Sequence, residues 1–346
     1  MNNNRIIFLG RNGIGKSNLL EAVELMGTLR SHRTGTDKEI IFHNEQSALI
    51  SAELSTNELV KIELNQKGGR RISFNNNLLS RHIDLMNFFR CVCFSSLDLN
   101  IVRGEPSLRR FWLDRVVNQL EPVYIDLISR YNRLLKQRIQ LWKNGLSLNR
   151  KEDQSLLDAF DQQMAIISTR IYRRRSRALK KIEPIASAWH GLFSQSIEQL
   201  NISYLPSCQI DSFDSEEKMI LSIQNQLKAQ RQIENKFGNC QIGPHRDEIQ
   251  FSINKLPARK FGSSGQQRTL VLSLKMAELD LVQEITGFNP ILILDDVLAE
   301  LDLQRQNSLL SKVGDKNQCL ISATHIDGFA KDWQTNSQIV DLELDS

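Results

Sequence analysis

Long apolar runs are missing from this sequence, since no stretch reaches the roughly 20 apolar residues that span a bilayer. The first residues also lack a basic segment followed by an apolar core and a small-residue cleavage site, so we do not expect secretion. Cysteines are few and odd in number, and no second pair completes a zinc site. We therefore expect the cysteines to be reduced core residues of a cytoplasmic protein. They are Cys91, Cys93, Cys208, Cys240 and Cys319.

A strong excess of charge of either sign is missing too, because 44 Lys and Arg face 40 Asp and Glu, which gives +4 at pH 7. The basic residues are nevertheless clustered. Dense clusters can neutralise phosphates and favour nucleic acid, but they can also form a solvated helix face paired with acids from elsewhere. Composition leaves both possibilities open. One cluster holds Arg103, Arg109, Arg110 and Arg115, and the other holds Arg170, Arg173, Arg174, Arg175, Arg177, Lys180 and Lys181.

Hydrophobic spacing divides the chain into an α/β part and a helical part. An apolar run at residues 5–9 predicts a buried strand, and a helix follows to about Met26, with Gly27 as its stop. Helical spacing returns from about Pro106 to Lys236. The sequence thus predicts a β-and-α domain of residues 1–105 and 236–346, split by an inserted helical lobe of residues 106–235. We expect antiparallel strands at 48–54, 59–64 and 71–74, further strands at 248–253, 291–294 and 318–322, and a helix from 266 to about 285.

The motif G-R-N-G-I-G-K-S at residues 10–17 matches the phosphate loop G-x-x-x-x-G-K-[ST] and lies between the predicted strand and helix. Its glycines let backbone N–H groups turn toward a triphosphate at the positive end of a helix. Lys16 is expected to bridge the β- and γ-phosphates, and the Ser17 hydroxyl to ligate Mg²⁺. The predicted ATP-binding residues of this segment are Gly10, Arg11, Asn12, Gly13, Ile14, Gly15, Lys16, Ser17 and Asn18.

A second apolar strand, at residues 291–294, ends in the paired acids Asp295 and Asp296. A buried parallel strand delivers its C-terminal residues to the phosphate site. We expect Asp295 to hold Mg²⁺ and Asp296 to orient or deprotonate the attacking water. The alternative is a core strand whose acids cap the next helix.

Further segments resemble the motifs of ABC ATPases. The run G-S-S-G-Q-Q-R at 262–268 is similar to their signature motif, A-E-L-D at 299–302 to the D-loop, and His325 to the switch histidine. The implied head is an α/β ABC-type P-loop ATPase head with an antiparallel β subdomain and an inserted α-helical lobe. The resemblance implies that Ser263, Gly265 and Gln266 bind the γ-phosphate held by a second subunit. It places Asp296, Lys16 and His325 in catalysis and Ser17 and Asp295 on the metal.

Three stretches narrow the resemblance to the RecF family. They are G-T-L-R-S-H-R-T at 27–34, D-L at 98–99 with G-E-P-S-L-R-R-F-W-L-D at 104–114, and G-P-H-R-D at 243–247. Two departures stand out. Family members begin with further residues that form the first strands, so we expect either a truncated N-terminus here or a start that was assigned too late. The P-E-D-L of the family reads S-L-D-L at 96–99.

The resemblance implies a DNA replication and repair protein, cytoplasmic and nucleoid-associated, that forms an ATP-dependent homodimer. It implies sequence-independent binding to duplex next to a single-stranded gap, work with RecR and RecO to load recombinase, and a part in the SOS response. Asp296 is one methylene shorter than the glutamate usual in ABC proteins, so we expect slow, DNA-stimulated ATP hydrolysis. The alternatives are an SMC-like DNA scaffold that binds ATP with little hydrolysis and the nucleotide subunit of a membrane transporter.

Overall fold

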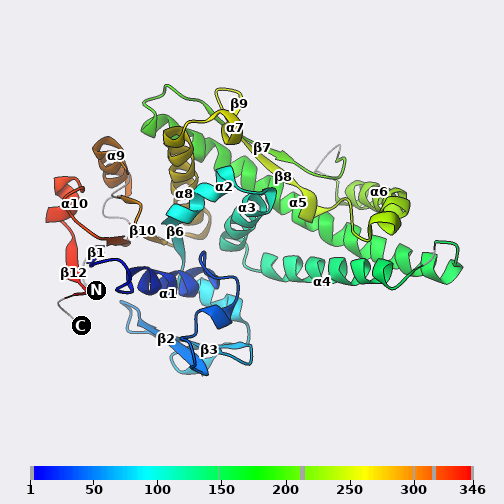
Figure 1. Ribbon diagram of the computed structural model, residues 1–346, viewed down its shortest axis with the longest axis horizontal. Helices are drawn as coiled ribbons and strands as arrows, with labels where there is room; N and C mark the ends of the chain where they lie inside the picture. The colour runs from blue at the N-terminus through cyan, green and yellow to red at the C-terminus, as the bar shows by residue number, and fades with distance from the viewer. Residues whose placement is uncertain (1–3, 147, 211–214, 299–300, 314–316, 344–346) are drawn as a thin grey trace. The chain divides into compact units, whose positions relative to one another are not determined.

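The computed structural model describes residues 4–146, 148–210, 215–298, 301–313 and 317–343 (Figure 1). The chain divides into two units. The first comprises Met1–Leu99, Leu192–Ser196 and Thr269–Ser346, and the second comprises Asn100–Gly191 and Ile197–Arg268. The division of the sequence into a head and a lobe of residues 106–235 stays a prediction.

A five-stranded parallel sheet forms the centre of the first unit, in the order β12-β1-β11-β10-β6. Its inner strands are apolar on both faces, as expected for a parallel sheet covered on two sides. The strands predicted at residues 5–9, 291–294 and 318–322 are therefore present, and they are neighbours in this sheet. The strands are β1 (Arg5–Leu9), β6 (Cys91–Ser95), β10 (Ile291–Asp295), β11 (Cys319–Ala323) and β12 (Gln338–Asp341).

Helix α1 (Lys16–Thr28) packs on this sheet, with Leu20 and Val23 against Cys91 and Cys93 of β6. The helix ends at Thr28, one residue beyond the predicted stop; Gly27 is its penultimate residue, and the left-handed cap is Leu29 instead. A Cβ on Gly27 would lie 2.5 Å from Cys91 Sγ and 2.8 Å from its backbone nitrogen. The glycine thus permits close packing of helix on strand. The other helices of the unit are α9 (Leu303–Val313), α10 (Lys331–Thr335) and the part of α8 (Ser264–Thr286) that follows Arg268.

An antiparallel sheet completes the first unit, in the order β2-β3-β4-β5. Its alternating pattern buries Val60, Ile62 and Leu64 on one face, and the three predicted strands are confirmed. The strands are β2 (Ser47–Glu53), β3 (Leu59–Asn65), β4 (Arg70–Phe74) and β5 (Asn77–Leu78), and the 3-10 helices are η1 (Asp37–Glu39), η2 (His82–Asn87) and η3 (Ser96–Leu99).

The second unit is mainly helical, as its spacing predicts, but it also contains an antiparallel sheet of order β7-β8-β9. Strand β7 (Leu200–Leu205) was not expected within the helical stretch; it pairs with β8 (Glu248–Ile253), far along the chain. None of the described helices of either unit is long and apolar enough to cross a membrane. The remaining elements are α2 (Asn100–Arg103), α3 (Pro106–Leu120), α4 (Tyr124–Lys143), α5 (Lys151–Phe193), α6 (Glu216–Phe237), η4 (Pro244–Arg246), β9 (Leu256–Pro257) and α7 (Ala258–Phe261).

Figure 1 labels three long helices of this unit, α4, α5 and α6. Buried ion pairs join them. Arg138 of α4 is fully buried; it donates to Glu234 of α6 at 2.8 Å and pairs with Asp161 of α5. Arg231 of α6 also pairs with Asp161. Two arginines and two buried carboxylates thus balance one another where an unpaired charge would cost several kcal/mol, and the half-exposed Asp158 pairs with Arg231 in addition, at 2.6 Å.

Candidate nucleotide-binding site

The phosphate loop follows β1, an inner strand of the parallel sheet, and leads directly into α1. Gly13 and Gly15 have φ values of 89° and 109°, a left-handed region that side chains with a Cβ rarely adopt. Arg11, Asn12 and Gly13 are exposed at the loop. The loop is therefore shaped by its glycines and open to a ligand at the N-terminus of a helix.

Lys16 folds back across this loop. Its ammonium group is buried and donates hydrogen bonds to the carbonyl oxygens of Gly10 at 2.6 Å and Arg11 at 3.1 Å. Those bonds hold a positive charge inside the loop, where an anion would meet it. The position fits the phosphate contact expected of this lysine.

Three oxygen groups from three elements meet beside the loop. The Ser17 hydroxyl of α1 and the Ser322 hydroxyl of β11 both donate to Asp295 Oδ1 of β10, at 2.9 and 2.6 Å. Asp295 is buried, with 7% of its surface exposed. Hydroxyl and carboxylate oxygens are the hard donors that Mg²⁺ prefers, so the residues fit this ion.

The structure thus brings together Ser17 and Asp295, the two residues predicted on the metal. Ser322 was missed as a site residue, although it lies in a predicted strand. Ser322 lies beside Asp295 because the two residues are partners in the register of β10 and β11. The sequence carries no signal for this register.

Asp296 differs from its neighbour, since its side chain is exposed and its φ is 55°. Its backbone N–H donates to Ser322 Oγ at 2.9 Å, which fixes the chain direction after β10. His325 is also exposed, two residues after β11 ends. Both residues follow neighbouring strands at the carboxyl edge of the sheet, where a ligand of this fold class binds.

The R-S-H-R-T segment after α1 binds back onto that helix. The Ser31 hydroxyl donates to Glu21 and accepts the backbone N–H groups of Arg33 and Thr34, at 2.9 and 3.0 Å. Arg33 in turn donates to Asn18 Oδ1 at 2.9 Å. Glu21 of α1 thus anchors the segment through Ser31. The anchored segment in turn places Arg33 against the side chain of Asn18, which directly follows the phosphate loop.

The S-L-D-L segment at 96–99 makes specific contacts through Asp98, although it departs from the family pattern. Asp98 accepts the backbone N–H of Ser95 at 2.8 Å and pairs with Lys275 of α8 at 2.8 Å. Lys275 is buried, and no sequence signal singled it out. The pair fixes the turn after β6 to helix α8.

Ser263, Gly265 and Gln266 belong to the second unit, whereas the phosphate loop belongs to the first. Ser263 caps α8, because its hydroxyl accepts the N–H of Gln266 at 3.2 Å and its own N–H donates to Gln266 Oε1 at 2.8 Å. Ser263 and Gly265 are exposed. Of the D-loop prediction, Ala299 and Glu300 lie outside the described residues.

The family-like motifs of the second unit meet in a buried ion cluster. Arg175 of α5 donates to Asp114 at 2.9 and 3.0 Å, to Asp247 at 2.8 Å and to the Pro244 carbonyl at 2.7 Å. Desolvation by burial raises the pKa of Asp247, although Arg175 and a hydrogen bond from Tyr204 lower it. Arg175 is therefore an internal residue of the basic run.

Two of the four arginines of the other basic cluster are buried as well. Arg109 is buried and donates to both carboxylate oxygens of Glu248, at 2.6 and 2.8 Å. Arg115 is buried too, and Arg110 donates to the carbonyl of Asp247 at 2.7 Å. For Arg109 and Arg110 the acidic and carbonyl partners lie within the same unit.

The fold and the site define the class of protein, a P-loop nucleotide-binding protein with the head fold of ABC-type ATPases. No family model matches the chain. The chain is 53% identical over 336 residues to the DNA replication and repair protein RecF of Parasynechococcus marenigrum (strain WH8102). The aligned region covers 97% of this chain and 92% of the relative. It is 42% identical over 344 residues to RecF of Cyanothece sp. (strain PCC 7425 / ATCC 29141), covering 98% and 90%.

A solved structure of the recombination mediator protein RecF-ATPrS in the RecFOR pathway matches with a TM-score of 0.84 and 31% identity. The match covers 94% of this chain and 87% of that one. A structure of RecF-ATP in the same pathway has the same TM-score of 0.84, over 93% of this chain. The chain belongs to the RecF family of DNA replication and repair proteins.

Proposed function

We propose that this chain is an ATP-dependent DNA-binding protein of recombinational repair and replication maintenance. The carrying observation is the cluster of Ser17, Asp295 and Ser322 beside a phosphate loop that holds Lys16. Solved relatives are described with ATP or ATPrS, and ATP is the ligand that this arrangement fits. The proposed place of action is the nucleoid.

In this proposal Ser17 and Asp295 hold Mg²⁺, whose charge offsets that of the phosphates. The loop N–H groups and Lys16 bind and orient the phosphates. Asp296, exposed just after β10, orients the attacking water, and His325 follows the adjacent strand β11 by two residues. Ser263 and Gly265 of a second copy complete the site, so that ATP drives formation of a homodimer.

The proposed partner is duplex DNA beside a single-stranded gap, bound without sequence preference, because no base-reading motif is present in the sequence. RecR and RecO are proposed to act with this protein in recombinase loading. These assignments rest on family membership and on the RecFOR pathway named for the solved relative.

The direct test uses Lys16→Ala, with the exposed Lys331→Ala of α10 as a matched control. Lys16→Ala should lose ATP binding, measured by calorimetry, and ATP-dependent dimerisation, measured by light scattering. Lys331→Ala should keep both. A Lys16→Ala protein that still dimerised with ATP would contradict the assembly proposal.

A second candidate is a DNA scaffold of the SMC-like class that binds ATP with little hydrolysis. The observation that favours it is Asp296, a short and exposed carboxylate in the expected place of the catalytic base. Single-turnover hydrolysis by wild type and Asp296→Asn, with and without DNA, separates the two. Equal slow rates support the scaffold, and a DNA-stimulated rate that disappears in the variant supports the ATPase.

A further inference from the structure

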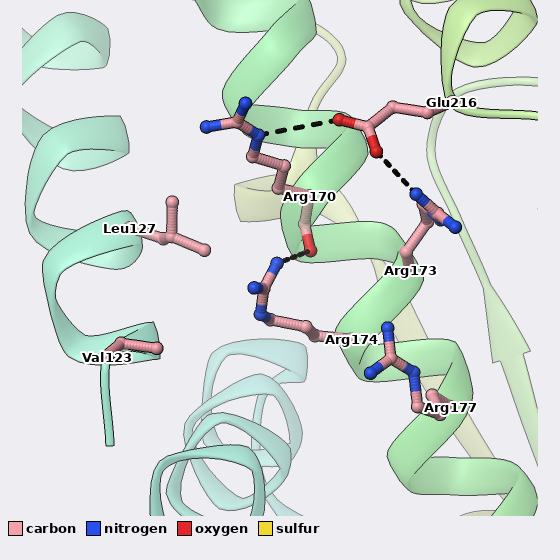
Figure 2. Close-up of a pocket in the computed structure, with 7 residues that line it drawn as sticks. All are labelled: Val123, Leu127, Arg170, Arg173, Arg174, Arg177 and Glu216. Carbon is pink, nitrogen blue, oxygen red and sulfur yellow. Dashed lines mark hydrogen bonds and ion pairs between the residues drawn. The ribbon is translucent and has the colours of Figure 1, made fainter. Parts of the chain in front are cut away.

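Four arginines of α5 line one cavity in the second unit, and Figure 2 shows them along the helix, with Arg170 and Arg173 at the carboxylate of Glu216. The cavity has a volume of about 380 Å³ and an apolar wall formed by the side chains of two residues at the start of α4. Its lining consists of Val123, Leu127, Arg170, Arg173, Arg174, Arg177 and Glu216.

Helical spacing explains which members of the basic run reach this cavity. Positions 170, 173, 174 and 177 repeat at i, i+3, i+4 and i+7, which is one face of a helix. Arg175 lies off this face and is buried in the ion cluster with Asp114 and Asp247. The basic run thus separates into an internal residue and a row that lines the cavity.

Two glutamates partly neutralise the row. Glu216, at the first position of α6, pairs with Arg170 at 3.6 Å and Arg173 at 2.5 Å (Figure 2). Glu121, at the end of α3, pairs with Arg174 at 2.9 Å and Arg177 at 3.2 Å. The side chains of Arg170 and Arg177 remain 47% and 56% exposed, so solvent and ligands reach them.

These interactions favour a ligand with several negative charges. Four guanidinium groups against two carboxylates leave an excess positive charge, and the guanidinium fork matches phosphate oxygens in a bidentate manner. Seven residues of helix span about 10 Å, which is long enough for the row to contact more than one phosphate of a strand. The apolar wall suits the sugar carbons between phosphates.

We propose that this four-arginine cavity holds the phosphate backbone of nucleic acid, and that Glu216 and Glu121 act as internal competitors that the backbone displaces. The inference rests on the proposed function and assigns it to residues of the second unit. Exposed ion pairs of this kind are weak, so a polyanion can replace them at small cost.

The test measures binding of a labelled random-sequence DNA duplex, with saturating ATP and in parallel without nucleotide, by fluorescence anisotropy over a range of salt concentrations. Near 0.1 M salt, the Arg173→Ala/Arg177→Ala double variant should bind roughly tenfold more weakly for each arginine removed, and its salt slope should be lower by about 2. Arg133→Ala, an exposed arginine of α4 that does not line the cavity, is the matched control and should change affinity less than about twofold.

Glu216→Gln should change duplex affinity in the opposite direction to the arginine variant. A general loss of fold would not strengthen binding, so this variant separates the proposal from that explanation. Freeing Arg170 and Arg173 should tighten duplex binding about two- to fivefold, the size of an exposed ion pair. Pyrophosphate added as competitor distinguishes a small-phosphate site, because a backbone site should release duplex only when many phosphates compete.

Unchanged duplex affinity in the double arginine variant, or weaker binding by Glu216→Gln, overturns the inference. If the wild type binds duplex and the arginine variant binds it equally, only the inference fails. If the wild type binds no duplex with or without ATP, the proposed function fails as well. Displacement by stoichiometric pyrophosphate would also overturn the inference, in favour of a free-phosphate ligand.

Discussion

Replacing Arg175 by methionine should destabilise the second unit and not merely weaken DNA binding. The substitution removes the partner of two carboxylates, Asp114 and Asp247, while keeping an unbranched side chain. Arg175 is 3% exposed and Asp247 is fully buried. Breaking a buried pair by removing one partner costs about 3–5 kcal/mol, a large part of the stability of an ordinary domain.

The pH dependence of this destabilisation has a definite sign. Burial raises the pKa of Asp247 even with Arg175 present, so the folded protein binds this proton more tightly than the unfolded chain. The contribution of such a group favours folding at low pH and is lost as the pH rises through the folded pKa. Removing Arg175 raises that pKa further. The destabilisation by Arg175→Met should therefore be smaller at pH 5 than at pH 8.

The assay is urea unfolding followed by circular dichroism at both pH values. The double variant Arg175→Met/Asp247→Asn is the control and should recover part of the stability, because the Ser207 N–H can still donate to the amide oxygen and the Tyr204 hydroxyl can accept from the amide NH2 group. Wild-type stability of Arg175→Met together with weaker DNA binding would refute this reasoning and make Arg175 a DNA contact.

Three further outcomes are expected. Ser322→Ala removes the 2.6 Å hydrogen bond that orients Asp295, so Mg²⁺-dependent ATP affinity should fall about tenfold while Mg²⁺-free binding is unchanged; equal effects in both would contradict a role through the metal. Lys275→Met leaves the partly buried Asp98 without its ion pair and should cost about 3 kcal/mol in urea unfolding, and an unchanged midpoint would refute this. Burial lowers the pKa of His245 from 6.5 to about 4, so this ring should stay neutral in NMR titration from pH 8 to 5. Stability should accordingly decline as the pH falls below about 6.5 toward 4, and His245→Asn should flatten that decline.

Much of the nucleotide site could be predicted because its signals are local. The phosphate loop needs glycines at fixed positions between a strand and a helix, and Gly13 and Gly15 do have left-handed φ values. The apolar strand that ends in Asp295 could likewise be recognised from its run of aliphatic residues. What the sequence could not show was that Ser322 lies beside Asp295, because pairing register joins strands far apart in the chain.

The strand β7 was missed for a related reason. Its alternation of Leu200, Ile202 and Tyr204 is short and lies between long helices, so local spacing favoured helix. The strand is stabilised by antiparallel pairing with β8, which lies far along the chain. Gly27 shows the same limit: a helix stop by residue type, it proves to be a point of close packing against β6.

The phosphate loop, the acid-tipped strand and the family motifs were determined by the sequence itself, because each depends on neighbouring residues along the chain. Only the tertiary structure decided what the basic run does. Arg175 became a buried counter-ion, whereas Arg170, Arg173, Arg174 and Arg177 came to line one cavity. The reason is physical: one helix places successive residues about 100° apart, and the charges that meet each face come from distant segments.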